Sequence, residues 1–287
     1  MFPQFLGIGA QKSGTSWLFW KLKHHPQIWL PPVKEIHYFN QNSSKPSVID
    51  LLFGSPFSRI RLRRQMRRAW RKKGQNIGWY LRYFFQVRSD DWYASLFSPS
   101  VGQIAGESTP NYSILDAERV GRIHTLMPEL KIIYLLRNPI HRTWSQLNRH
   151  DRQTHFRGNY ATESVIKQFM VQEEPHRHSN YPENLQIWSS FYPQEQIFIG
   201  FFEQIAENPR QLLSDLYQFL DVDSSEQYIP PNVHKKVNAG QYSPIPAHWA
   251  RYLAERYHEQ LKLLHDRFNN CSTASWLEVA EEYLGVC

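Results

Sequence analysis

A glycine turn that carries one lysine stands near the start of the chain, in "FLGIGAQKSGTSWLFWKL" (5–22). Gly9 and Gly14 let the backbone turn sharply after an apolar run, and Thr15 can begin a helix. Successive N–H groups at such a turn, together with a helix N-terminus, form a positively polarised hollow that suits an anion. Lys12 adds a full positive charge there. These residue types therefore predict a phosphate- or sulfate-binding turn.

This turn differs from the P-loop of nucleotide-hydrolysing enzymes, which reads G-x-x-x-x-G-K-[ST]. The stretch "GAQKSGTS" keeps the glycine spacing, but Lys12 lies two residues before Gly14 and Thr15 takes the usual place of the lysine. A P-loop enzyme also needs a carboxylate that supports Mg²⁺. One strand-like run ends in Arg137 instead, whereas another is followed by Glu203. A P-loop-type nucleotide kinase therefore stays open as an alternative.

A second stretch repeats this arrangement, in "YLLRNPIHRTWSQLNRH" (134–150). An apolar run delivers Arg137 to its carboxyl end, Pro139 suits a first helical turn, and Ser145 lies on that helix. An arginine fork with a hydroxyl suits a second phosphate. Each stretch alone would also fit an exposed turn or a structural ion pair. Together they predict a ligand with two anionic groups.

The elements that must hold these residues alternate along the chain. Four short runs are largely apolar throughout, as expected for strands that are covered on both faces. These runs are 5–10, 102–107, 131–137 and 196–202. Helical patterns occupy 15–25, 113–127, 139–150, 160–173, 183–192, 208–220, 247–268 and 273–284. The alternation predicts a single α/β domain over 1–287, with three layers (α/β/α) and a central, mainly parallel sheet.

The segment 41–90 does not follow this alternation and is predicted to be an insertion. Its centre, "RIRLRRQMRRAWRKKG" (59–74), holds nine Arg or Lys residues with apolar residues between them. It could form a basic amphipathic helix or a solvated surface segment, and could contact a membrane surface or a polyanion. A basic polyanion-binding module is therefore a third hypothesis. It ranks last because it leaves both anion sites unexplained, and no nucleic acid partner is expected.

Composition limits the class of protein further. The chain has 287 residues, a formal net charge of +7 and a pI near 9.3, which favours an anionic ligand or partner. Its two cysteines, Cys271 and Cys287, form no disulfide or metal pattern. The N-terminus has neither a signal-peptide nor a membrane-span pattern, so a cytoplasmic location is expected.

Taken together, these stretches resemble the sulfotransferases that use 3′-phosphoadenosine 5′-phosphosulfate (PAPS) and release 3′-phosphoadenosine 5′-phosphate (PAP). "QKSGTSWL" (11–18) is similar to the 5′-phosphosulfate loop of that family, and Arg137 with Ser145 to its 3′-phosphate site. "VKEIHYF" (33–39) is most similar to the heparan-type and bacterial branch. Further similar stretches are "DWYASLF" (91–97), "GESTPNY" (106–112), "FFEQIAENPRQLLSDLYQFLDV" (201–222) and "KKVNAGQYSPIP" (235–246).

The resemblance implies a role for each site residue. Glu35 would be the catalytic base, with His37 as the second candidate, and Lys12 would contact the transferring sulfuryl group. Those implied in PAPS binding are Gln11, Lys12, Ser13, Gly14, Thr15, Ser16, Trp17, Arg137, Ser145, Lys235, Lys236, Asn238 and Gly240. Those implied in acceptor binding are Lys34, Glu35, His37, Trp92, Tyr93 and Tyr112, although Trp92 and Tyr93 suit core packing equally well.

The implied reaction is in-line transfer of a sulfuryl group to a hydroxyl or amine, which depends on positioning and charge stabilisation. No metal is expected, since a lysine and backbone donors suffice and the thirteen histidines show no convincing ligand spacing. Ile36 and Ser108 stand where heparan-type enzymes usually have proline and lysine. The acceptor therefore stays open between a small molecule, a lipid and a glycan, with the first two favoured.

Overall fold

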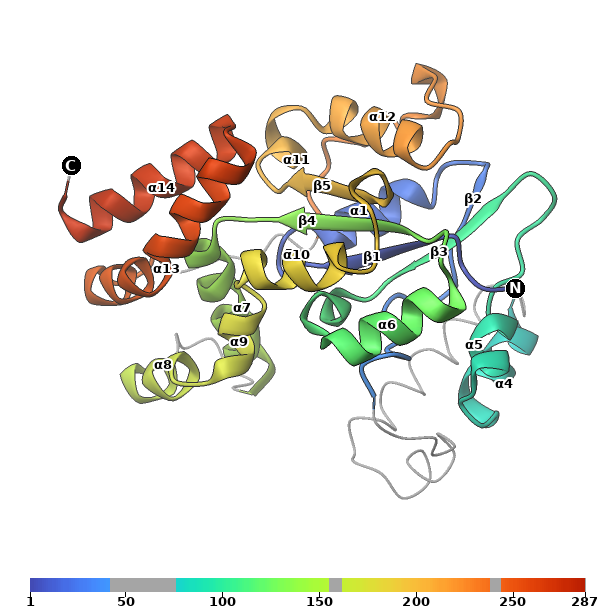
Figure 1. Cartoon of the computed structure of the whole chain (residues 1–287), viewed down its shortest axis with the longest axis horizontal. Helices are drawn as coiled ribbons and strands as arrows, with labels where there is room; N and C mark the ends of the chain where they lie inside the picture. Colours follow the sequence, from blue (N-terminus) through green and yellow to red (C-terminus); the bar gives the residue numbers. More distant parts are fainter. Residues whose placement is uncertain (42–75, 155–161, 238–243, 287) are drawn as a thin grey trace.

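The computed structural model describes residues 1–41, 76–154, 162–237 and 244–286. The basic segment 59–74, Asn238 and Gly240 lie outside these described ranges. Within them the chain forms one sheet with helices on both faces (Figure 1). No helix in the described ranges is both long and apolar enough to cross a membrane.

Five parallel strands form the sheet, in the spatial order β2-β3-β1-β4-β5. Their bounds are Phe5–Gly9 (β1), Ile28–Trp29 (β2), Ile104–Ser108 (β3), Lys131–Leu136 (β4) and Ile197–Phe201 (β5). The chain runs to one side of β1 for β2 and β3, and to the other side for β4 and β5. Ligands of open α/β sheets bind at such a reversal, beyond the carboxyl ends of the strands. The sequence missed only β2 among these strands, because two residues carry no readable pattern.

Side chains of the central strands alternate between two apolar clusters, one on each face of the sheet. On β1, Leu6 and Ile8 pack in the larger cluster, whereas Phe5 packs in the smaller one. On β4, Tyr134 and Ile133 divide in the same way. All five side chains are at most 1% exposed. This two-sided burial is the physical reason why the strands read as largely apolar runs.

Helices cover both clusters and produce the three layers that the sequence predicted (Figure 1). The smaller cluster is covered by α1 (Thr15–Leu22) and α12 (Pro209–Phe219). The larger is covered by α6 (Ala117–Leu126), α7 (Pro139–Thr154), α10 (Tyr181–Ser189) and α13 (Ala247–Phe268). The other helices of the described ranges are α4 (Ile77–Phe85), α5 (Asp90–Ser95), α8 (Glu163–Met170), α9 (Glu173–Arg177), α11 (Gln204–Glu207) and α14 (Cys271–Leu284).

Several of the predicted helices are shorter than their sequence patterns, among them those over 113–127 and 160–173. The pattern over 113–127 becomes α6 only from Ala117, because Asp116 caps that helix by accepting a hydrogen bond from the Arg119 N–H (2.9 Å). The residues before it form a tight 3₁₀ turn over Pro110–Ile114. The pattern over 160–173 gives α8 alone, which ends at Met170.

Two helices that the sequence analysis missed, α4 and α5, lie in and just after the segment 41–90. Aromatic side chains of α4 are buried in the larger cluster; they are Trp79, Tyr80, Tyr83 and Phe84. Residues 77–85 therefore pack into the same core as the sheet. The pattern was hard to recognise because the opposite face of α4 is also apolar, with exposed Ile77, Leu81 and Phe85.

Candidate active site

The predicted anion-binding turn directly follows β1 and is tightly packed. Gly14 has φ 87°, and a Cβ there would lie 2.3 Å from Ile205 Cδ1. Both the backbone conformation and the lack of space therefore favour glycine at this position. Lys12 also lies in the left-handed region, with φ 73°. Ser13 is fully buried and donates its N–H to Ala10 O (3.2 Å). Ser13 thus shapes the turn through its backbone.

The N-terminus of α1 supplies backbone donors next to this turn. No side chain caps the helix at Gly14, and Leu18 donates the first intrahelical bond, to Gly14 O (3.1 Å). The N–H groups of residues 15–17 therefore precede that bond and are available as a cluster of donors. The Trp17 side chain is buried and its Nε1 donates to Val233 O (2.9 Å). Trp17 can thus offer its backbone N–H to an anion, while its side chain holds the segment at Val233.

Two arginines hold the carbonyl groups of the turn. Arg137 Nη1 donates to Lys12 O (3.0 Å), and Arg142 Nη1 reaches Gln11 O (3.4 Å). Arg142 is fully buried and also donates from Nε to Ser179 Oγ (2.6 Å). With these carbonyls turned toward guanidinium groups, the turn keeps its electropositive side for a ligand. Sequence reasoning missed Arg142, although its place five residues after Arg137 on α7 was a usable signal.

Arg137 and Ser145, which the sequence predicted to share a phosphate, line one cavity of about 360 Å³. His141 and Trp144 of α7 and Tyr283 of α14 line it as well. Arg137 Cζ also lies 4.4 Å from the centre of the Phe202 ring, in cation–π geometry. The structure thus brings Arg137 beside both the turn after β1 and the cavity beside α7.

The predicted base, Glu35, lies on a loop (33–39, below called the Glu35 loop) whose backbone N–H groups make several hydrogen bonds. Glu35 and His37 both have positive φ, at 68° and 59°. The Glu35 N–H donates to Ser108 O (3.1 Å) and the Ile36 N–H donates to Glu107 Oε2 (3.3 Å). The Tyr38 N–H is held by the Tyr112 hydroxyl (2.9 Å). This anchoring at the carboxyl end of β3 lets non-glycine residues keep an uncommon conformation.

Glu35 carries a paired carboxylate that is 29% exposed. Lys34 Nζ lies 2.7 Å from Oε1, and His37 Nε2 lies 3.6 Å from Oε2. Burial on its own raises the pKa of Glu35, but the hydrogen bond with His37 and the charge of Lys34 outweigh it and hold that pKa far below its ordinary value. Lys34 Nζ also reaches Thr15 Oγ1 (3.3 Å). Lys34 therefore connects Glu35 to the start of α1.

The aromatic residues expected to line an acceptor cleft are buried instead. Trp92 is 3% exposed, and Tyr93 and Tyr112 are fully buried. The Tyr93 and Tyr112 hydroxyls donate to Glu107 Oε1, at 2.7 and 2.9 Å. Burial, and then the charge of Glu107, raise the pKa of both tyrosines, so they stay protonated donors. In this structure these aromatic residues lie beneath the Glu35 loop, where they offer little or no surface to an acceptor.

Glu107 accepts the hydrogen bonds that hold these tyrosines and the Glu35 loop together. Sequence reasoning did not identify it as a site residue. Besides Ile36 and the two tyrosines, Thr109 Oγ1 donates to its Oε2 (2.8 Å), and the side chain is fully buried. All of these partners are donors, which fits a carboxylate that only accepts. A glutamate at the end of a buried strand, in "GQIAGE" (102–107), was the available signal.

Glu107→Gln should therefore destabilise the protein by about 1.5–3 kcal/mol, the usual worth of a hydrogen bond to a charged group. An amide offers one acceptor oxygen, and its NH₂ group would face donors. Thermal unfolding followed by circular dichroism measures the loss. Glu118→Gln, on the exposed side of α6, is the matched control and should melt like the unaltered protein. Equal melting of both variants would contradict the supporting role of Glu107.

The segment that carries Lys235 and Lys236 lies beside α1. The Trp17 bond to Val233 O holds it there, and Lys21 Nζ of α1 donates to Asn232 Oδ1 (2.8 Å). Lys235 and Lys236 are exposed. The rest of this predicted nucleotide-closing stretch, including Asn238 and Gly240, lies outside the described residues.

In the described part of the chain, no group of three or more His, Cys, Asp or Glu side chains could hold a metal ion. Glu203, the remaining carboxylate for a P-loop kinase, accepts a hydrogen bond from Trp276 Nε1 (3.0 Å).

Comparison with known proteins identifies the family: the chain belongs to the sulfotransferases, because the family model for the sulfotransferase domain matches residues 2–276. It is similar to a membrane-associated sulfotransferase of Dictyostelium discoideum, with 23% identity over 93% of this chain and 65% of that protein. A bifunctional heparan sulfate N-deacetylase/N-sulfotransferase of Drosophila melanogaster is 25% identical over 79% of this chain. The chain spans only 20% of the length of that relative.

Solved structures agree on the fold. A sulfotransferase from Alicyclobacillus acidocaldarius superposes with a TM-score of 0.66 at 22% identity, covering 96% of this chain and 99% of that one. The mouse sulfotransferase SULT7A1, solved in complex with PAP, gives a TM-score of 0.51 at 14% identity. That match covers 99% of this chain and 89% of the mouse chain. The three-layer fold predicted from the sequence is thus the sulfotransferase fold.

Proposed function

We propose that this sulfotransferase moves a sulfuryl group from PAPS to a hydroxyl or amine of an acceptor, with Glu35 as the base and without a metal. The observation that carries this proposal is the position of Arg137. Its guanidinium donates to Lys12 O in the turn after β1 and also lines the cavity with Ser145. One arginine at the carboxyl end of β4 thus joins two anion-binding sites, as a nucleotide with phosphates at both ends of its ribose requires.

The residues available for the 5′-phosphosulfate are the backbone donors of residues 15–17 and the side chain of Lys12. Arg137 and Ser145 suit the 3′-phosphate, since guanidinium and hydroxyl groups both donate to phosphate oxygens. The exposed Lys235 and Lys236 would close over the nucleotide. The mouse neighbour was solved with PAP, which supports this choice of donor over ATP.

The transfer step needs a proton acceptor and stabilisation of charge. Glu35 takes the proton of the acceptor hydroxyl or amine as the new bond to sulfur forms and the bond from sulfur to the 5′-phosphate oxygen breaks. Lys12 and Lys34 would stabilise the negative charge that develops on the transferring group and on the leaving PAP. Lys34 suits this task because its Nζ reaches both Thr15 Oγ1 and Glu35 Oε1.

The ion pair between Lys34 and Glu35 also explains how a carboxylate of low pKa can act as a base. In the free protein Lys34 neutralises Glu35 and makes it weakly basic. When sulfuryl oxygens attract Lys34, the carboxylate loses part of that neutralisation and its affinity for a proton rises. Donor binding would thereby activate the base.

Calorimetry tests the donor directly. PAP should bind without Mg²⁺, whereas ATP should bind weakly with or without it. Transfer is then measured with radiolabelled PAPS against small phenols, lipid hydroxyls and N-deacetylated heparan fragments. Binding of ATP-Mg²⁺ in preference to PAP would overturn the proposal in favour of a nucleotide kinase.

Arg137→Ala should weaken PAP binding by about 1.5–3 kcal/mol, or about 10- to 150-fold, because a charge-assisted hydrogen bond is lost. Since Arg137 also bonds Lys12 O, part of the loss could arise at the turn. 5′-AMP, which lacks the 3′-phosphate, separates the two effects: its affinity should fall much less. An equal loss for PAP and 5′-AMP would remove Arg137 from the 3′-phosphate site.

A further inference from the structure

The cavity beside α7 contains a titratable side chain with no assigned role, His141. Arg137, His141 and Ser145 are spaced four residues apart, and the last two lie one turn apart on the same face of α7. All three line the cavity of about 360 Å³. His141 is half-buried, and its ring has no hydrogen-bond partner among the described residues.

We propose that His141 is a third ligand of the 3′-phosphate and that it takes up a proton when this phosphate binds. This inference rests on the proposed PAPS-dependent function. It adds a proton-linked step to nucleotide binding: affinity for PAP increases as the pH falls, and release of PAP is favoured as the pH rises.

The charges that face His141 explain why the proton arrives with the ligand. Arg137 faces it from the end of β4 and Tyr283 from α14, and no carboxylate of the described residues lines the cavity. Burial raises the pKa of Glu203, whose carboxylate accepts a hydrogen bond from Trp276 Nε1. Burial, and then the charge of Arg137, lower the pKa of His141, so its imidazole is neutral in the free protein near neutral pH.

A bound phosphate reverses this balance. Its two negative charges offset Arg137 and give the imidazolium an anionic acceptor, which the described residues of the cavity lining do not include. The pKa of His141 therefore rises on binding. Between its free and bound values, one proton enters with the nucleotide. Trp144 and Ile245, also at the cavity, are apolar and supply no competing charge.

Calorimetry of PAP binding to the full chain at pH 6 to 8.5 tests the inference. Measurements in two buffers of different ionisation enthalpy give the number of protons taken up. The unaltered protein should take up close to one proton near pH 6.5 with PAP. With 5′-AMP it should take up markedly less. This comparison needs no variant.

His141→Gln keeps a polar side chain on the helix but removes the titrating ring. It should bind PAP about tenfold more weakly at pH 6, with little change at pH 8.5, because one pKa unit corresponds to a factor of ten. The phosphate itself titrates near pH 6, but it does so in both proteins, so their difference isolates His141. His124→Gln, on α6, is the control and should match the unaltered protein.

Two results separate the inference from the function on which it rests. If PAP binds tightly with the same proton uptake and the same affinity in His141→Gln, the role of His141 is wrong while the PAPS-dependent function stands. If PAP does not bind the unaltered protein at any pH, the proposed function fails, and the inference fails with it.

Discussion

Lys12→Ala is expected to lower turnover with PAPS by at least about 10²–10³-fold, the usual cost of removing one donor that stabilises transition-state charge. Lys12 lies in a turn whose carbonyl groups are held by Arg137 and Arg142. Because the backbone oxygen of residue 12 remains in the variant, the turn should keep its shape. The measurement is initial-rate transfer from labelled PAPS at saturating donor.

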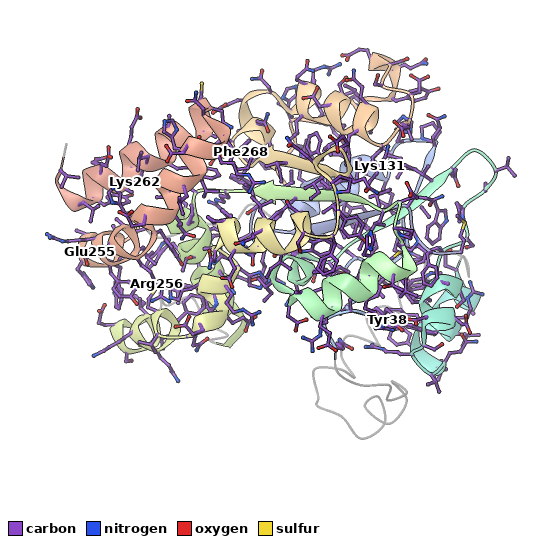
Figure 2. All side chains as sticks on the ribbon, viewed as in Figure 1. Tyr38, Lys131, Glu255, Arg256, Lys262 and Phe268 are labelled. Carbon is purple, nitrogen blue, oxygen red and sulfur yellow. The ribbon has the colours of Figure 1, made fainter. Side chains whose placement is uncertain are left out.

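The fold of Lys12→Ala should be intact, so the loss is chemical. Its melting temperature should stay close to that of the unaltered protein. Lys262→Ala is the matched control, since this lysine is exposed on α13, at the other end of the molecule from Tyr38 and the Glu35 loop (Figure 2). It should retain full turnover. Full turnover of Lys12→Ala as well would exclude Lys12 from the reaction.

The fold could be predicted from the sequence because burial on both faces of the sheet requires apolar residues along the central strands. Leu6 and Ile133 point to opposite faces of the sheet and are both buried, so neighbouring positions on the central strands are apolar. Ile28 and Trp29 form a strand of only two residues, which is too short to produce a recognisable pattern of apolar residues. Helix α4 was missed for a related reason, since its exposed face is as apolar as its buried one.

The residues proposed to bind the anion could be selected from the sequence, because backbone chemistry ties such a site to local sequence. The glycine turn after β1 can be recognised in "GAQKSGTS". The arginine that directly follows β4, Arg137, can be recognised in the same way. Glu107 and Arg142 were not recognised, because their roles depend on partners far away in the chain. Glu107, for example, accepts from residues 71 positions before it and 14 positions before it.

The same reason explains why the sequence left two interpretations open for the aromatic residues. Trp92, Tyr93 and Tyr112 have the chemistry of a binding cleft, and a sequence does not show which side of a loop they occupy. The structure places the tyrosine hydroxyls on a buried carboxylate. The partly exposed side chains of the loop that carries Glu35 thus become the remaining candidates for contact with the acceptor, namely Glu35, His37 and Lys34.

Glu35→Gln should reduce kcat by about 10²–10⁴-fold, the range that general-base catalysis contributes, with essentially unchanged affinity for PAP. The amide has the same shape, and the backbone bond to Ser108 O does not involve the side chain. Calorimetry with PAP and single-turnover transfer measure the two quantities separately. His37→Asn is the informative comparison: if it abolishes transfer while Glu35→Gln does not, the base is His37.

The pH dependence gives a second test of the same residue. Because the pKa of Glu35 is held far below its ordinary value, the carboxylate is ionised in the free enzyme at neutral and mildly acidic pH. Protonation of Glu35 should therefore cause no loss of kcat/KM as the pH falls from 7 to about 5. Lys34→Met removes the charge that opposes protonation, so the pKa of Glu35 rises and an acidic limb should move up toward neutral pH. An identical acidic limb in both proteins would mean that Lys34 does not control the base.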